Sequence, residues 1–198
     1  MGSRVMHYCI STILKNELKI DDDQFLLGGL APDVYKSKGE LKEISHFIKK
    51  NDCSTGYIDY GSFHNKYLTK NTNPFHLGYY FHLISDDIWL KEIYNKKVKW
   101  LPQDIKTEAK KMYYQDFWKL NGMLIDYYSL KIVPLKEQSI SIDEFDYMLL
   151  PELISDLETD FNMADSVKEE SLEILEFTEV IQTIERTVAT CIENLKKT

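Results

Sequence analysis

The segment from Phe75 to Trp89, FHLGYYFHLISDDIW, places a histidine and an aspartate four residues apart in an otherwise apolar and aromatic stretch. Asn73 suits the N-cap of a helix, and Pro74 suits its first position, where a missing N–H costs nothing. Residues four apart share one helix face, so His82 and Asp86 point the same way. Because that face is otherwise apolar, we expect it to be buried, and buried polar groups need partners. A divalent metal would satisfy both side chains.

Each of these side chains also has a purely structural interpretation. A single histidine on an aromatic helix face is commonly a hydrogen-bonded core residue, and Asp86 could cap a loop or pair with a lysine. Asp33, in GGLAPDVY, follows Pro32 in the manner of a turn aspartate. In the same segment, the neighbouring Gly28 and Gly29 let the backbone approach another element closely.

The chain has five histidines, and three of them occur in distinctive surroundings. They are His7 in SRVMHYC, His46 in ISHF and His82 in FHLISDD. Imidazole nitrogens and carboxylate oxygens are the usual ligands of zinc and similar first-row metals. Together with Asp33 and Asp86, these histidines predict a metal centre assembled from separate segments of the chain.

In this order the residues resemble the zinc-dependent phospholipase C superfamily, which also contains single-strand-specific nucleases. That family combines a histidine near the N-terminus, an aspartate and a histidine from the next helices, and an HxxxD helix. The contexts SRVMH, GGLAPD, SHF and LGYYFHLISDD are most similar to its small intracellular bacterial branch. The resemblance covers roughly residues 3–120 and implies an all-α, single-domain, multi-helix bundle of the phospholipase C and nuclease type over residues 1–198.

The resemblance also implies a role for each residue. Asp33, His46, His82 and Asp86 would hold one metal ion, and Asp86 would bridge to a second ion near His7. In the secreted enzymes the N-terminal amine and the first carbonyl also bind that second ion. In this chain six residues precede His7.

The chain departs from the family where a third metal would bind. The family uses a histidine ten residues after the HxxxD histidine, and then a His-x-x-x-Glu or His-x-x-x-Asp pair, but no histidine follows His82 here. The corresponding position is Glu92, and Asp116 on the next predicted helix is preceded four residues earlier by Met112. We therefore expect one or two zinc ions, with Asp116 as a further candidate ligand or a polar part of the site wall. Carboxylate ligands would also admit manganese or iron.

Such a site predicts a hydrolase. A bound divalent ion lowers the pKa of water to about 7 and polarises a phosphoryl oxygen. Asp33 is the candidate catalytic residue that would orient or deprotonate this water, and Tyr57, Tyr79 and Tyr80 are expected in the cleft walls. The expected substrate is a small phosphoester or a compound like a lipid headgroup. The alternatives are a helical binding module of the same fold with weakened catalysis, and a structural oligomer built on the C-terminal helix.

Composition limits the other function classes. The net charge of −8 argues against a broad nucleic-acid-binding face, which would need a surplus of lysine and arginine. The three cysteines form no CxxC pair, which favours free thiols in a reducing compartment. Residues 1–20 lack the apolar core of a signal peptide, and no apolar run is long enough to cross a membrane. We therefore expect a cytoplasmic protein.

Helical periodicity covers most of the chain, over residues 4–18, 22–30, 59–69, 74–95, 104–129, 143–160 and 164–196. Residues 36–57 are expected to form a loop that carries His46 on a short turn, and residues 130–142 an extended segment. Pro151 is expected to break or kink its helix. The last helix has a continuous apolar stripe that could close the bundle or pair with a second copy of the chain.

Overall fold

The computed structural model describes residues 2–35, 39–51, 56–69, 73–138, 140–164, 166 and 169–196. Within these residues the fold is all-α, as the sequence predicts, and the only sheet is a two-stranded hairpin. The α-helices are α1 (Arg4–Glu17), α2 (Gln24–Gly28), α3 (Gly39–Ser45), α4 (Tyr60–Tyr67), α5 (Pro74–Trp89), α6 (Gln103–Tyr127), α7 (Leu150–Ala164) and α8 (Phe177–Lys196).

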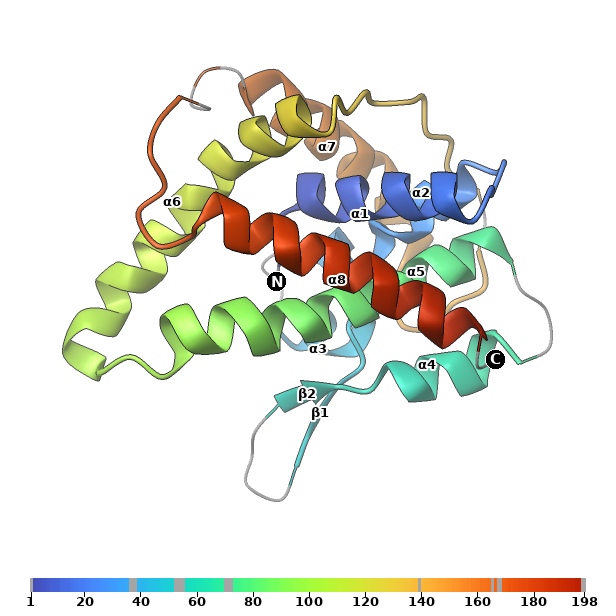
Figure 1. Ribbon diagram of the computed structural model, residues 1–198. Helices are drawn as coiled ribbons and strands as arrows, with labels where there is room; N and C mark the ends of the chain where they lie inside the picture. Colours follow the sequence, from blue (N-terminus) through green and yellow to red (C-terminus); the bar gives the residue numbers. More distant parts are fainter. Residues whose placement is uncertain are drawn as a thin grey trace.

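Shorter elements join these helices. Two 3₁₀ helices, η1 (Ala31–Tyr35) and η3 (Tyr147–Leu149), precede α3 and α7. A π-helical segment, η2 (Leu90–Lys99), continues α5, where the sequence predicts that a single helix runs to residue 95. Strands β1 (Ile48–Lys50) and β2 (Gly56–Ile58) pair antiparallel and form the hairpin at the lower edge of the view in Figure 1.

Helix α5 lies in the middle of the molecule, in contact with α1, α2, α4 and α8 (Figure 1). The predicted cap is present, since the Asn73 side chain accepts a hydrogen bond from the Phe75 amide and Pro74 occupies the first turn. Only Pro74, His76 and Ile88 of this helix are less than fully buried. Its apolar and aromatic sequence therefore matches a helix that is covered on nearly all sides.

Helices α2 and α5 touch through their backbones, because glycine occupies the contact. A Cβ atom on Gly28 would lie 2.0 Å from the carbonyl oxygen of Phe75, and one on Gly78 would lie 2.1 Å from that of Phe25. Both distances are far below van der Waals contact, so larger residues are excluded at both positions. The expectation of a close backbone approach at this glycine pair is confirmed at Gly28, and the contact brings the chain leading to Asp33 against α5.

The prediction of a loop over residues 36–57 is wrong for residues 39–45 and for the two strands, whereas His46 stands on a short turn as predicted. Residues 39–45 form α3, and the hairpin follows it. Most side chains that the structure describes in α3 are exposed, so the helix leaves no apolar period in the sequence. Phe47 has a left-handed φ of 52°, which reverses the chain directly after His46.

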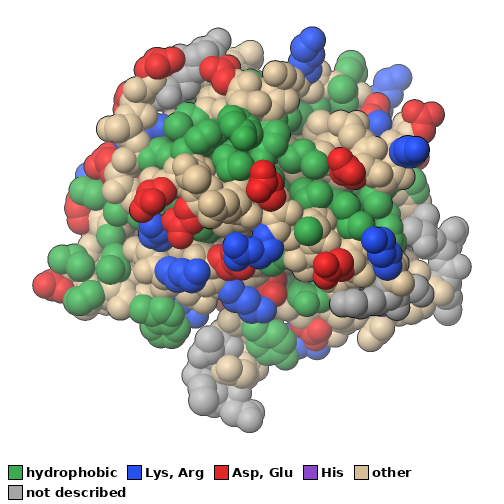
Figure 2. Space-filling view, viewed as in Figure 1, with side chains coloured by type: hydrophobic (Ala, Val, Ile, Leu, Met, Phe, Trp, Pro, Cys, Tyr) green, Lys and Arg blue, Asp and Glu red, His purple; other side chains and the backbone are tan. Residues whose placement is uncertain are grey.

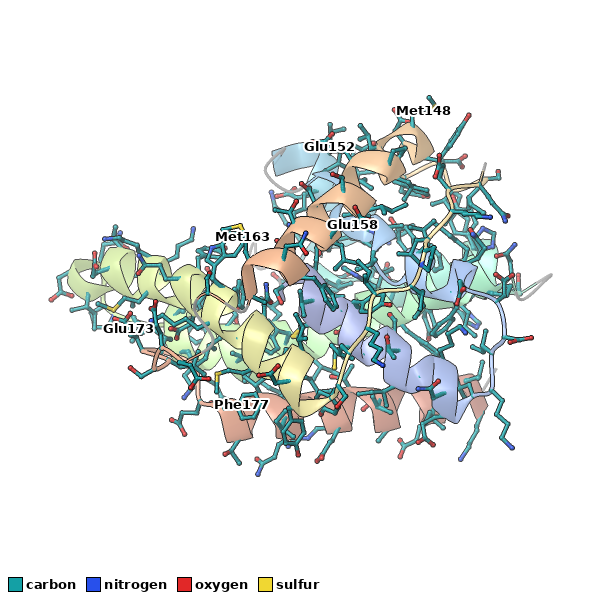
Figure 3. All side chains as sticks on the ribbon, turned by 90° about the horizontal axis from the view of Figure 1, so that it is seen from above. Met148, Glu152, Glu158, Met163, Glu173 and Phe177 are labelled. Carbon is teal, nitrogen blue, oxygen red and sulfur yellow. The ribbon has the colours of Figure 1, made fainter. Side chains whose placement is uncertain are left out.

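The C-terminal third also differs from the prediction. Helix α8 begins at Phe177 rather than at residue 164, and Figure 3 shows the segment from Glu173 to Phe177 beside α6. Pro151 lies in the first turn of α7, where proline is tolerated, so it starts the helix instead of breaking it. The apolar stripe of α8 packs on α1 and α5 and closes the bundle. Pairing with a second copy stays a prediction.

The surface carries both signs of charge. Figure 2 shows acidic and basic side chains interspersed among apolar patches on the face that carries α8. None of the helices over the described residues combines the length and apolar character needed to cross a bilayer. Cys9 and Cys191 are buried free thiols, as predicted, whereas Cys53 lies outside the described residues.

Candidate metal centre

Five side chains from four parts of the chain converge in the interior. His7 comes from α1, Asp33 from η1, His46 from the residue after α3, and His82 and Asp86 from α5. All five are buried, with exposed fractions of at most 5%. Two overlapping groups have donor atoms close enough to hold an ion. One is His7, Asp33 and His82, and the other is His46, His82 and Asp86; within each group the donor atoms lie within 4.8 Å of one another.

Asp86 is the hub of this cluster. Its Oδ1 lies 3.2 Å from Nε2 of His7, and its Oδ2 lies 3.3 Å from Nε2 of His46 and 3.6 Å from Nε2 of His82. The backbone N–H of Gly2 also donates to Oδ1, at 3.3 Å. Nε2 of His46 lies 3.4 Å from Oδ1 of Asp33. The spacing of four residues in α5 therefore places both side chains on the face that the sequence predicts.

Backbone carbonyls fix the protons of two of the imidazoles. Nδ1 of His82 lies 2.8 Å from the carbonyl oxygen of Gly29, and Nδ1 of His46 lies 3.0 Å from that of Lys42. A carbonyl only accepts hydrogen bonds, so each Nδ1 carries the proton, and in the neutral ring Nε2 presents a lone pair. These two Nε2 atoms lie 3.4 Å apart and both face Asp86. The centre thus gathers lone pairs and carboxylates around a common point, and this arrangement fits a cation.

Burial keeps His82 neutral. Removal from water lowers its pKa to about 4, an effect to which the neighbouring His7 adds, although Asp86 opposes it. The rings of His7 and His82 stack with their centroids 3.8 Å apart. Nε2 of His7 is buried 3.2 Å from Oδ1 of Asp86, in a geometry that falls short of a full hydrogen bond. A buried nitrogen in this condition also fits a metal ligand, because a metal would use its lone pair.

Asp33 joins the cluster to a lysine. Burial works against its ionisation, but the Lys42 ammonium and the contact with His46 outweigh burial and hold the pKa of Asp33 well below its usual range. Nζ of Lys42 lies 2.9 Å from Oδ1 of Asp33. At neutral pH the carboxylate is therefore charged, as a metal ligand must be.

The turn that carries His46 is held from two sides. The hydroxyl of Ser45 donates to the carbonyl of Pro32 at 2.8 Å, which ties the end of α3 to η1. The hydroxyl of Tyr79 donates to the carbonyl of Ser45 at 2.6 Å, which ties the same turn to α5. These bonds fix the backbone on which the imidazole stands. They also show that Tyr79 supports the cluster from within the core.

Asp116 and Glu92 lie in other interactions. Both oxygens of Asp116 accept hydrogen bonds from the backbone amides of residues 173–175, at 2.7 to 3.1 Å. Asp116 belongs to neither candidate ion-binding group, so the structure does not bring it to the metal centre as the sequence suggests. Glu92 forms an ion pair with Arg186 of α8. Within the described residues, neither carboxylate takes the place of the histidines that the chain lacks.

A cavity of about 570 Å³ opens beside the cluster. Asp33 and Lys42 line it, together with Gly2, Ser3, Arg4, Tyr114, Phe117, Trp118, Asn121 and Asp160. The prediction that Tyr57, Tyr79 and Tyr80 form the cleft walls is wrong. Tyr79 and Tyr80 are buried in the core, and Tyr57 lies on the hairpin. The aromatic wall instead comes from α6, where Tyr114 and Trp118 are four residues apart, a spacing that could have indicated a shared face.

Comparison of the chain with protein-family models, with curated proteins and with solved structures gives no significant match.

Proposed function

We propose that this protein is a metal-dependent hydrolase that cleaves small phosphoesters with a metal-activated water. The observation that carries the proposal is the convergence of the unprotonated Nε2 atoms of His46 and His82 on the Asp86 carboxylate, 3.3 and 3.6 Å away. Buried lone pairs and negative charge are unfavourable together unless a cation neutralises them. Oδ1 of Asp33 lies 3.4 Å from Nε2 of His46 and Asp33 also lines the cavity, so a substrate in the cavity would reach the cluster through Asp33.

The donor set favours zinc, because imidazole and carboxylate ligands in a compact buried cluster suit this ion. His46, His82 and Asp86 would hold an ion in one candidate group, and His7, Asp33 and His82 would hold it in the other. Both candidate groups include His82, so the number of ions is itself a quantity to be measured. The carboxylate share of the set also supports manganese or iron.

A bound divalent ion would supply a hydroxide-like water at neutral pH and would shield negative charge on the phosphoryl group. Asp33 is the residue that belongs to both the cluster and the cavity, so its carboxylate can orient that water or take its proton. Lys42 holds Asp33 from the cavity side and presents a positive charge to an anionic substrate. The carbonyls of Gly29 and Lys42 keep the two imidazoles in the tautomer that ligation needs.

The proposal is tested by elemental analysis and by turnover of bis(4-nitrophenyl) phosphate and 4-nitrophenyl phosphate with added zinc or manganese. We expect at least one bound ion per chain and metal-dependent hydrolysis. His46→Ala should lose the bound ion and the hydrolysis. His64→Ala, on α4 outside the cluster, should keep the ion and the hydrolysis. Asp33→Asn with normal metal content should cost activity, and full activity in that variant would remove the role as a base. A chain that takes up no ion would refute the proposal.

The binding module of the same fold is the second candidate. It is favoured by the engagement of Glu92 with Arg186 and of Asp116 with the backbone, which leaves no third-metal ligand set among the described residues. Stoichiometric metal binding without turnover of either ester would support this candidate over the hydrolase.

A further inference from the structure

One stripe of helix α6 forms a wall of the cavity beside the metal centre. Its residues recur at intervals of three and four, which places them on a single helix face. They are Tyr114, Phe117, Trp118 and Asn121. Asp33 and Lys42 line the same cavity. A molecule in the cavity would therefore meet the charges of these two residues and of the Arg4–Asp160 ion pair. From α6 it would meet aromatic rings and one amide.

The aromatic part of the stripe is unusually exposed. Tyr114 is 50% exposed and Trp118 is 44% exposed, although both belong to a cavity wall. Large aromatic rings gain most from being covered, and they do so by stacking against another flat ring. The exposed surface of these two side chains is therefore available to cover a planar group.

Asn121 supplies a second, independent observation. Its side chain lies in the cavity wall, yet it is only 3% exposed, and its amide oxygen has no hydrogen-bond partner among the described residues. Buried side-chain polar atoms nearly always have a partner, and those without one often have a functional reason. The amide oxygen is an acceptor, so a ligand that carries an O–H or N–H group would satisfy it.

We propose that this wall binds the leaving group of the substrate, and that the substrate is a phosphoester whose alcohol carries a planar ring with a hydrogen-bond donor. The inference rests on the proposed function. The phosphoryl group lies toward Asp33 and Lys42, the ring stacks on Trp118 and Tyr114, and the donor reaches Asn121. In the reaction, the oxygen of water bonds to phosphorus, the bond from phosphorus to the ring-bearing oxygen breaks, and that oxygen leaves with a proton.

The test uses phosphonates, which bind as phosphoesters do but resist hydrolysis because they lack the scissile oxygen. Affinities of methylphosphonate, phenylphosphonate and the 3- and 4-hydroxyphenyl phosphonates are measured by calorimetry on the zinc-loaded protein. We expect phenylphosphonate to bind on the order of tenfold more tightly than methylphosphonate, because of stacking. At least one hydroxyphenyl compound should bind about threefold more tightly still, because of the added hydrogen bond.

Two variants separate these contributions. Trp118→Ala should remove the advantage of the phenyl over the methyl compound, and Asn121→Leu should remove only the advantage of the hydroxyl group. Trp100→Ala is the matched control, since Trp100 is 70% exposed and lies outside the cavity wall. Melting temperatures of all three variants monitor folding, and each comparison between ligands is made within one variant, so a general loss of affinity does not imitate a change of preference.

The outcomes distinguish the two proposals. A zinc-loaded protein that binds all the phosphonates equally, or binds none of them, overturns the assignment of the wall and leaves the metal centre standing. A protein that takes up no metal overturns the proposed function. Retention of the ring preference in Trp118→Ala, or of the hydroxyl preference in Asn121→Leu, also overturns the assignment.

Discussion

Replacement of Asp116 by asparagine distinguishes a structural carboxylate from a metal ligand. In the structure Oδ2 of Asp116 accepts hydrogen bonds from the amides of Glu173, Ile174 and Leu175, at 3.1, 2.7 and 2.9 Å. Oδ1 accepts a further bond from Glu173 at 2.9 Å. The side chain is fully buried, so its loss cannot be compensated well by water. The carboxylate thereby holds the segment that leads into α8.

The expected loss in the free energy of unfolding follows from the hydrogen bonds that Asp116 accepts. Hydrogen bonds to a charged acceptor are worth about 1.5–3 kcal/mol, and neutral ones about half as much. In Asp116→Asn one oxygen remains to accept bonds from three amides, so we expect a loss of about 3 kcal/mol in the free energy of unfolding. Asp116→Ala leaves these amides without a partner and should cost roughly 5 kcal/mol. Glu108→Gln removes an exposed carboxylate from the same helix, where it pairs only at the surface with Lys111, and should change stability by less than about 0.5 kcal/mol.

The assay is urea unfolding followed by fluorescence, with the metal content measured on the same samples. We expect Asp116→Asn to unfold at lower urea concentration while its metal content stays that of the wild type. The reasoning is refuted if the variant keeps wild-type stability, or if it loses metal as His46→Ala does. The second result would restore Asp116 as a ligand.

Three further predictions concern the centre and its support. Gly78→Ala should lower the free energy of unfolding by about 1–3 kcal/mol, because the new Cβ would strike the carbonyl of Phe25. The same clash should displace the neighbouring Gly29, whose carbonyl binds His82, and so weaken metal binding. An unchanged metal affinity in a titration would contradict this. In the metal-free protein the pKa of His82 is lowered to about 4, so the imidazole binds a proton more readily in the unfolded state than in the folded state. Up to about 3 kcal/mol of the free energy of unfolding should therefore be lost as the pH falls from about 6.5 to 4. Urea midpoints across this range should show a shallower slope in His82→Gln, and an equal slope would exclude His82 as the source. Zinc at a hundredfold excess over its dissociation constant should stabilise the metal-free chain by about 2.7 kcal/mol, measured as a rise in melting temperature.

The sequence predicts the candidate metal centre better than it predicts the surroundings of that centre. His82 and Asp86 could be paired from helical spacing alone, and Asn73 with Pro74 marked where that helix begins. His7, Asp33 and His46 could not be placed together by spacing. Their grouping rests on the resemblance, and the structure brings the five side chains together without showing membership in that family.

The predictions from the sequence are wrong where a contact joins segments that lie far apart in the chain. Asp116 stands in an aromatic helix and suggests a ligand, but its partners are amides of a segment about sixty residues later, which no local pattern reveals. The same contact explains why helical periodicity extended α8 too far toward the N-terminus, since amides bound to a carboxylate are not free to form helical bonds. The unpartnered amide of Asn121 likewise becomes visible only when its neighbours are known.

The centre draws its side chains from positions 7, 33, 46, 82 and 86, so an ion bound there would act as a cross-link between four elements in the first half of the chain. Closing loops of this length removes conformational freedom from the unfolded chain, much as a disulfide does. Unlike a disulfide, this link would open on addition of a chelator. Removal of the ion should therefore loosen the elements that each contribute one side chain, α1 among them, and faster hydrogen exchange of α1 amides would report the release.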